Sequence, residues 1–217
     1  MQRTIYVVGE AYSGCETVCK YISNQYNYRL LKLNDFIDVM YNDFAKAYDT
    51  PEPQRSLKKF DAIMLNAQIF YHITGIPDFY ITKIMYNWID LFKKYSSPAV
   101  IKWHIYQSLV ETVPAWRKMY CRDCIVEHKN TNFVVCNIYD FNKDVHLTPN
   151  SIVIYVEATP AAIYKHTNKL FNTVIYNAKF TDDISKIKDN ADFVITNNGT
   201  RPELYKQIQE IMKVIGD

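Results

Sequence analysis

The feature that most constrains the fold is an apolar run followed by a glycine-flanked loop and an amphipathic helix. Residues 4–8 (Thr-Ile-Tyr-Val-Val) form a continuous β-branched and apolar run, which is typical of a buried parallel strand. The run enters a loop framed by Gly9 and Gly14, and apolar residues then recur at helical spacing from Val18 to Tyr26. A strand, a loop and a helix in this order provide the context that a phosphate-binding loop requires.

Strand-like and helical segments alternate along the rest of the chain. Further strands are expected at residues 28–33, 132–136, 151–156 and 192–196. Helical spacing dominates residues 35–94, 100–110 and 115–126. A last helix is expected to open with a capping box, in which Thr200 and Glu203 accept hydrogen bonds from free main-chain amides. This alternation predicts an α/β fold with a mostly parallel sheet and helices on both faces.

The composition excludes several classes of protein. Hydrophobic residues make up 48% of the 217 residues, which is enough to form a core and excludes intrinsic disorder. Because 25 basic residues face 23 acidic ones, the net charge of +2 argues against a nucleic-acid binder. No apolar run approaches the roughly 20 residues of a membrane span, and the first residues do not resemble a signal peptide. An odd number of cysteines, five, favours the reducing cytoplasm over a disulfide framework.

A single domain over residues 1–217 is expected, because the sequence has no internal repeat and no linker. Residues 35–98 are expected to form a helical insertion or lid within it. Cys121 and Cys124 could be imagined as half of a zinc site, but they lie in a predicted helix and share one of its faces. Helix packing is therefore the favoured interpretation of this cysteine pair.

The loop keeps the glycine spacing of a phosphate-binding loop but not its charge. The full pattern is G-x-x-x-x-G-K-[ST]. In this sequence Cys15 stands at the lysine position and Glu16 follows it, so a neutral thiol and a carboxylate replace a cation. The motif alone leaves two interpretations open, a phosphate cradle or a turn that closes a strand onto a helix. The candidate binding residues of this loop are Gly9, Ser13, Gly14, Cys15, Glu16 and Thr17.

Residues 192–204 (Asp-Phe-Val-Ile-Thr-Asn-Asn-Gly-Thr-Arg-Pro-Glu-Leu) resemble the closing segment of the P-loop nucleoside monophosphate kinases, most closely the bacteriophage deoxynucleoside monophosphate kinases. In that family a turn of this kind follows the last strand near the nucleotide base, and an amphipathic helix closes the chain. The resemblance implies a three-layer, P-loop kinase-like sheet with a helical insertion. It adds Asn197, Asn198 and Gly199 to the candidate nucleotide-binding residues, and it implies ATP and Mg²⁺ as cofactors if the pocket is functional.

The resemblance also implies that catalytic groups are missing. It places the magnesium-side hydroxyl, the essential lysine and the following acid at Thr17, Cys15 and Glu16. Basic residues that the phage enzymes carry in the loop fall on Ala11 and Tyr12, and the family's Asp-x-Arg segment falls on Asn137 and Tyr139. An arginine of this type can be worth about 10³–10⁵ in rate, so the resemblance implies that residual kinase activity is slight unless other cations substitute. Basic residues that could substitute are Lys20, Arg55, Lys58, Lys59, Arg117 and Arg122.

Aromatic residues crowd the predicted insertion, at Phe70, Tyr71, Phe79, Tyr80, Tyr86, Trp88, Phe92 and Tyr95. They are expected to form the core of a helical subdomain, and the alternative is a surface for a protein partner or for self-association. Near-neutral charge argues against base stacking on nucleic acid.

Three functions are consistent with these observations. The favoured one is a degenerate, catalytically inactive deoxynucleoside monophosphate kinase-like protein that serves in binding or assembly. The alternatives are an active kinase that transfers the γ-phosphoryl group of ATP and a nucleotide-binding regulator without hydrolysis. Richness in Tyr, Asn, Ile and Lys fits an AT-rich viral genome, which would place the protein in the host cytoplasm or the virion.

Overall fold

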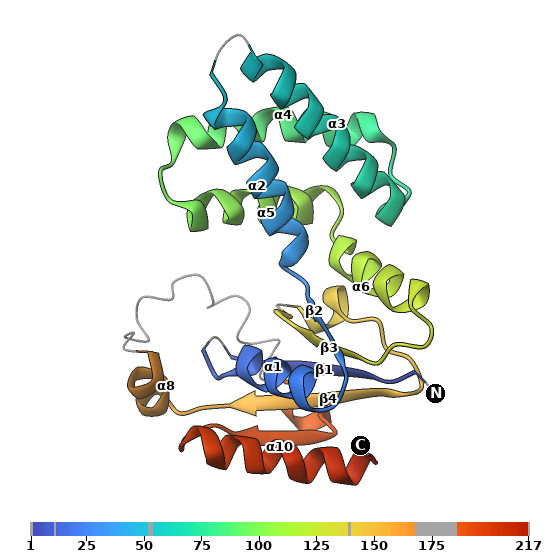
Figure 1. Ribbon diagram of the computed structural model, residues 1–217, viewed down its shortest axis with the longest axis vertical. Coiled ribbons are helices and arrows are strands. Elements are labelled where there is room, and N and C mark those ends of the chain that lie inside the picture. The colour runs from blue at the N-terminus through green and yellow to red at the C-terminus, as the bar shows by residue number, and fades with distance from the viewer. Residues whose placement is uncertain (1, 11, 52–53, 139, 168–185, 217) are drawn as a thin grey trace. The chain divides into compact units, whose positions relative to one another are not determined.

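A computed structural model of the 217-residue chain describes residues 2–10, 12–51, 54–138, 140–167 and 186–216 (Figure 1). The chain divides into two compact units. One consists of Met1–Leu33 and Cys124–Asp217, and the other is the continuous segment Asn34–Asp123. Among the described residues no helix is long and apolar enough to cross a membrane.

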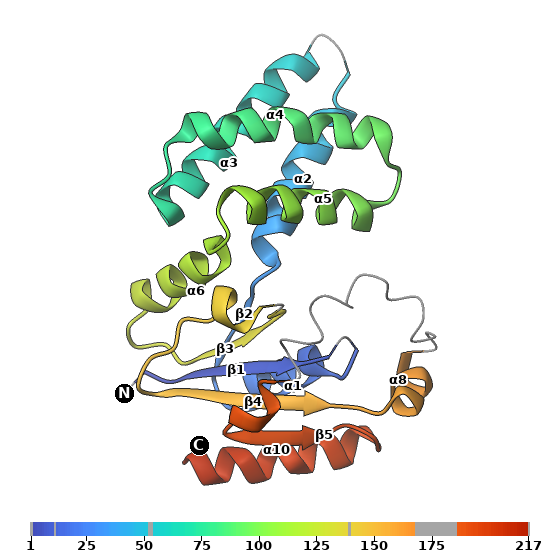
Figure 2. The same cartoon turned by 180° about the vertical axis from the view of Figure 1, so that it is seen from behind.

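A parallel sheet is the centre of the first unit. Its five strands in the described residues are β1 (Thr4–Gly9), β2 (Arg29–Lys32), β3 (Phe133–Cys136), β4 (Ser151–Glu157) and β5 (Phe193–Thr196). Figure 2 shows them in the order β2-β3-β1-β4-β5. Strand β1 lies between two partners, because Ile5 is opposite Val134 of β3 on one edge and Ile152 of β4 on the other. The strands predicted from the sequence are confirmed to within a residue or two at their ends.

Two helices cover one face of the sheet. They are α1 (Cys15–Gln25), which follows the loop after β1, and α10 (Arg201–Ile215), which closes the chain. The apolar faces of both helices share one core with the strand side chains that point toward them. From the helices this core contains Val18, Ile22, Leu204 and Ile208, and from the strands Ile5, Val134, Ile154 and Ile195. The helical spacing in the sequence therefore marks the faces of both helices that are buried.

The remaining strand side chains point to the opposite face. The Tyr6 hydroxyl donates a hydrogen bond to the main-chain oxygen of His146, and the His128 ring packs edge-on against Phe133. His146 follows α7 (Phe141–Asp144), and His128 follows α6 (Trp116–Glu127). The segments after these two helices therefore lie on this opposite face. Helix α8 (Pro160–Thr167) follows β4, and a 3₁₀ turn (Lys188–Asn190) precedes β5. Three layers, with a parallel sheet and a loop after its central strand, confirm the predicted three-layer α/β fold.

The second unit is helical. It contains α2 (Asp35–Asp49), α3 (Gln54–Thr74), α4 (Asp78–Lys94), α5 (Pro98–Thr112) and most of α6. Trp88 of α4 packs edge-on against Phe44 of α2, and its indole Nε1 donates a hydrogen bond to Ser108 Oγ of α5 at 2.7 Å. Because of such contacts the unit extends beyond residue 98, and Pro98 begins a helix inside it. The count of a single domain stays a prediction.

The aromatic residues of this unit divide between core and surface. Phe70 and Trp88 are buried, whereas Tyr71 and Tyr86 are each about half exposed at 51% and 53%. The side chains of Phe79 and Tyr80 lie outside the described residues. The sequence favoured a core position for the whole group, and the structure confirms this for part of it.

The ends of two helices illustrate what local sequence determines. The predicted capping box of α10 is confirmed, because Glu203 Oε2 accepts hydrogen bonds from the main-chain nitrogen and the hydroxyl of Thr200 at 2.6 and 3.0 Å. Helix α6 begins at Trp116, one residue inside the predicted range of residues 115–126, and Pro114 lies in the turn before it.

Ile208 tests the packing of α10 on the sheet. It is fully buried, so Ile208→Ala should lower the free energy of unfolding by about 2–4 kcal/mol through lost burial and a residual cavity. Val214 on the same helix is 74% exposed, and Val214→Ala should change stability by less than about 0.5 kcal/mol. Urea unfolding followed by far-UV circular dichroism measures both, and equal effects would contradict the assigned buried face.

Candidate functional site

The loop between β1 and α1 has a backbone that requires glycine at both ends. A Cβ atom on Gly9 would collide with the main-chain oxygen of Val156 and lie only 2.6 Å from Ser13 Oγ. Gly14 has a φ of 109°, in the left-handed region that other residues rarely adopt. Tyr12 also has a positive φ, of 65°. The predicted glycine-flanked loop is therefore a tight turn packed against strand β4.

The Cys15 thiol lies inside this turn. Its Sγ is 3.4 Å from Ser13 Oγ, and a Cβ on Gly9 would lie 2.9 Å from it. Burial raises the pKa of the Cys15 thiol to about 11, and the hydrogen bond with Ser13 only partly opposes that rise. The group at the lysine position is therefore neutral at physiological pH.

Glu16, in the first turn of α1, holds two lysines. Its Oε1 is 2.8 Å from Lys32 Nζ at the end of β2 and 3.0 Å from Lys20 Nζ one turn along α1. The hydrogen bonds from Lys32 and then Lys20 hold the pKa of the Glu16 carboxyl below its usual value. Sequence reasoning considered Lys20 but missed Lys32, since no local pattern relates the end of β2 to the start of α1.

A second carboxylate lies close to the loop. Burial raises the pKa of the Tyr155 phenol to about 12, and the nearby Glu10 carboxylate contributes to the rise. Glu10 belongs to the loop itself, and Tyr155 pairs with Val8 in the sheet. Two carboxylates, Glu10 in the loop and Glu16 at the start of α1, therefore lie near position 15, and the residue at that position is not a cation.

Asn197 joins the end of β5 to the loop. Its Nδ2 donates a hydrogen bond to the main-chain oxygen of Ser13 at 2.8 Å, and both side chains are buried. The same Nδ2 is the nearest atom to a Cβ placed on Gly14. The structure thus brings together the two segments that the sequence assigned to one site, at the carboxyl ends of the strands.

The other two residues of the predicted turn contact the segment that follows β4. Asn198 Oδ1 accepts a hydrogen bond from the Thr159 main-chain nitrogen at 2.7 Å, and the Gly199 oxygen lies 3.0 Å from a His166 ring nitrogen. Their proposed role in nucleotide binding stays a prediction. In the described structure these polar atoms connect neighbouring segments of the chain.

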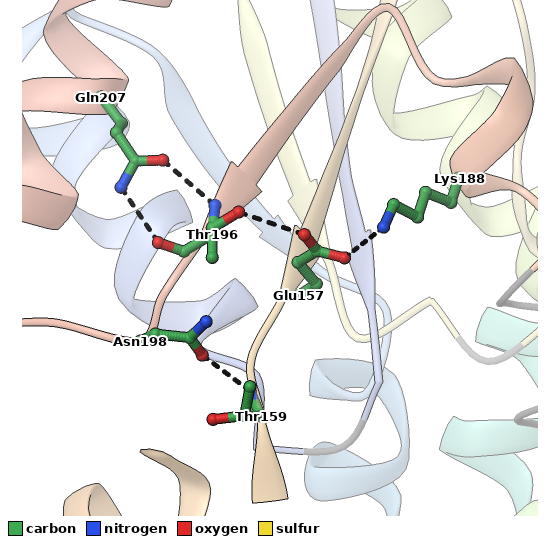
Figure 3. Close-up of polar contacts among 6 residues, drawn as sticks. All are labelled: Glu157, Thr159, Lys188, Thr196, Asn198 and Gln207. Carbon is green, nitrogen blue, oxygen red and sulfur yellow. Dashed lines mark hydrogen bonds and ion pairs between the residues drawn. The ribbon is translucent and has the colours of Figure 1, made fainter. Parts of the chain in front are cut away.

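A polar network fixes the ends of β4 and β5, as Figure 3 shows. The Gln207 side chain bonds both the nitrogen and the oxygen of Thr196, at 3.1 and 3.0 Å. The Thr196 hydroxyl donates to Glu157 Oε1 at 3.1 Å, and the other Glu157 oxygen forms an ion pair with Lys188. The hydrogen bond from Lys188 holds the pKa of the Glu157 carboxyl below its usual value. Glu157 is thus an ionised, paired carboxylate, which was missed although it directly follows an apolar run.

The structure describes only some of the positions at which the resemblance implies that a catalytic charge is missing. Ala11 and Tyr139 lie outside the described residues. Asn137, which follows β3, adopts a left-handed backbone with a φ of 62°. Among the alternative cations in the helical unit, Arg117 is buried with its guanidinium over the Tyr106 ring, and Arg122 pairs with the neighbouring Asp123 at 3.0 Å.

The shape of the site suits the phosphates of ATP, but its charge does not. The glycine-framed turn and the start of α1, which has no side-chain cap, provide main-chain N–H groups of the kind that bind phosphate. The neutral Cys15 and the carboxylates of Glu10 and Glu16 oppose an anion there. In the described part of the chain no cluster of three or more His, Cys, Asp or Glu side chains could hold a metal ion. The residues therefore fit the shape of a phosphate site but not its charge.

The fold is similar to that of solved structures with low sequence identity. TT1252 from Thermus thermophilus superposes with a TM-score of 0.55 at 12% identity, over 100% of this chain and 98% of that one. Dephospho-CoA kinase from Campylobacter jejuni gives a TM-score of 0.45 at 14% identity, over 99% of this chain and 97% of that one. No protein-family profile matches the sequence, and a search of curated proteins finds no match.

The high pKa of Cys15 predicts slow and strongly pH-dependent alkylation. At pH 8 the thiolate fraction should be about 100-fold below that of an ordinary thiol, and the rate should rise up to about pH 11. Iodoacetamide labelling of Cys15, followed by peptide mass spectrometry, measures this rate. The urea-unfolded chain is the control, and a rate that levels near pH 9 in the folded protein would contradict the raised pKa of the partly buried thiol.

The Asn197 hydrogen bond predicts a stability effect at the site. Asn197→Ala leaves the Ser13 oxygen without its donor, so the free energy of unfolding should fall by about 1–3 kcal/mol. Hydrogen exchange should also become faster at the Ser13 amide, which bonds the Glu10 oxygen across the turn. Asn24→Ala, at an exposed position of α1, is the control and should have less than about 0.5 kcal/mol effect.

Proposed function

We propose that this chain is a catalytically inactive relative of the P-loop nucleotide kinases, of the deoxynucleoside monophosphate kinase type, that serves in binding or assembly. The observation that carries the proposal is the Cys15 thiol, neutral and partly buried at the position where phosphoryl transfer needs a lysine. A viral source, suggested by the composition, and with it a location in the host cytoplasm or the virion, belong to the same proposal.

The charges around the loop support the absence of phosphoryl transfer. Catalysis of this reaction is almost wholly positioning and neutralisation of the negative charge on the phosphates. In the part of the chain that the structure describes, Lys20 and Lys32 lie beside the start of α1, and both are paired with Glu16. With Glu10 included, two carboxylates balance these two ammonium groups, so the described residues give the loop no net positive charge for a triphosphate.

A nucleotide-binding regulator without turnover is the second candidate. It is favoured by the same two lysines, because an incoming phosphate could compete with Glu16 for their ammonium groups. The main-chain N–H groups of the first turn of α1 would then supply the remaining contacts. Binding to the unmodified protein distinguishes this candidate from the first.

Calorimetric titration with ATP and dATP, with and without Mg²⁺, tests both candidates. The inactive binding protein is expected to give no heat. In a Cys15→Lys, Glu16→Thr double variant, a cation is added and a carboxylate is removed, so binding in roughly the micromolar range should appear. Cys15→Lys alone should gain less, because Glu16 remains.

Two controls complete the experiment. Gly14→Glu should abolish any binding in either background, because its side chain meets Asn197 and its backbone would be strained. Circular dichroism verifies that each variant is folded. Micromolar binding by the unmodified chain, abolished by Gly14→Glu, would support the regulator instead. Phosphoryl transfer to any of the four deoxynucleoside monophosphates by the unmodified chain would contradict both candidates.

A further inference from the structure

A groove lies between α3 and α4 in the helical unit. It has a volume of about 420 Å³ and is lined by Ser56, Lys59, Phe60, Tyr86, Ile89, Asp90 and Lys93. The lining residues follow helical spacing on both helices, so one face of each helix forms a wall. The three-residue connection between Thr74 and Asp78 makes α3 and α4 a helical hairpin, and the groove runs along it.

Positive charge exceeds negative charge at this groove. Asp90 Oδ1 is 2.8 Å from Lys93 Nζ, and the hydrogen bond from Lys93, with a smaller contribution from Lys59, holds the pKa of the Asp90 carboxyl below its usual value. Arg55 is close enough to Lys93 to act on its ammonium group. Lys59 and Lys93 in the lining, with Arg55 near Lys93, therefore outnumber the Asp90 carboxylate, and an anionic partner would be attracted.

The rest of the lining is mostly apolar and consists of Phe60, Tyr86 and Ile89, with Ser56 as its polar member. Phe60 is 50% exposed and Tyr86 53% exposed, while Ile89 is buried between them and the core. Leu57, next to Ser56 on α3, is 63% exposed. Large apolar side chains exposed beside cations are the arrangement that binds an amphipathic ligand with acidic edges.

We propose that the α3–α4 groove docks an acidic amphipathic helix of a protein partner. Tyr86 and Lys93 are seven residues apart on α4, a length of about 10 Å or two helical turns, which suits the apolar face of a short helix. Leucine or aromatic side chains of that helix would contact Phe60 and Tyr86. Its glutamates or aspartates would pair with Lys59 and Lys93.

This site extends the proposed binding role to a second surface and is independent of the loop after β1. The groove is formed within Asn34–Asp123 alone, whereas the loop belongs to the other unit. Titration of groove variants with ATP should therefore give the same result as the unmodified chain. The ATP titration tests the proposal for the loop, and the peptide titration tests the proposal for the groove. A negative result in one titration does not change the expected result of the other.

Fluorescence anisotropy with the full chain tests the proposal. The probe is a fluorescein-labelled peptide of about 14 residues, roughly four helical turns, with leucines on one face and glutamates on the other. We expect binding in roughly the micromolar range that weakens as salt is raised from about 50 to 500 mM. A peptide with lysine for each glutamate, and one of the same composition in scrambled order, should bind at least about tenfold more weakly.

Variants of the groove identify the site. Lys59→Glu with Lys93→Glu, and separately Phe60→Ala with Tyr86→Ala, should each weaken binding of the glutamate peptide by about tenfold or more. Lys206→Glu, exposed on α10, and Tyr164→Ala, 50% exposed on α8, are matched controls that should leave it unchanged. Circular dichroism confirms that the variants are folded.

Several outcomes would overturn the proposal. Equal binding by the charge-reversed variant or by the lysine peptide would show that the attraction is not the one described. Displacement of the probe by a single-stranded oligonucleotide would assign the groove to nucleic acid. A dimer in sedimentation that dissociates in the groove variants would make a second copy of the chain its occupant.

Discussion

Strand β1 is hydrogen-bonded to β3 on one edge and to β4 on the other, and this double pairing determines where the loop after it emerges. Because β1 is central, the loop lies at the carboxyl edge of the sheet with strands on both sides. Gly9 lies against the Val156 oxygen of β4, and Asn197, just beyond β5, bonds the Ser13 oxygen. The shape of the candidate site therefore follows from the packing of three strands and not from the loop sequence alone.

Shape and charge are separable properties of this site. The geometry of the turn depends on Gly9, Gly14 and main-chain hydrogen bonds, all of which are present in this chain. The charge depends on single side chains, and here a partly buried thiol at Cys15 and a carboxylate at Glu16 occupy the start of α1. Glu16 also binds Lys32 and Lys20, so it gives those cations an intramolecular partner. The glycine-framed turn thus has main-chain N–H groups of the kind that bind phosphate, whereas Cys15 and Glu16 bring no positive charge to it.

The sequence allowed most of the fold to be predicted, because apolar runs and helical spacing are local signals. The strands, the α10 capping box and the glycine requirement of the loop are examples. The Glu16–Lys32 ion pair and the contact of Asn197 with Ser13 join segments that only the folded sheet brings together, so no periodicity indicates the exact partners. The resemblance of the closing segment did indicate that the region of Asn197 lies near the loop. The extent of the helical unit to Asp123 was not predicted, since Pro98 is equally compatible with a boundary and with the first turn of a helix.

The helical unit is a continuous stretch inserted between β2 and β3, and this has a consequence for how the chain folds during synthesis. When β1 and β2 leave the ribosome, the β3 strand that lies between them in the sheet has not yet been made. The inserted helices, with a core drawn from neighbouring residues, can fold during this interval. The sheet can be completed only after β5 and α10 emerge. Until β3 and β4 emerge, the apolar edges of β1 and β2 remain without their partners, which exposes the nascent chain to aggregation during this interval.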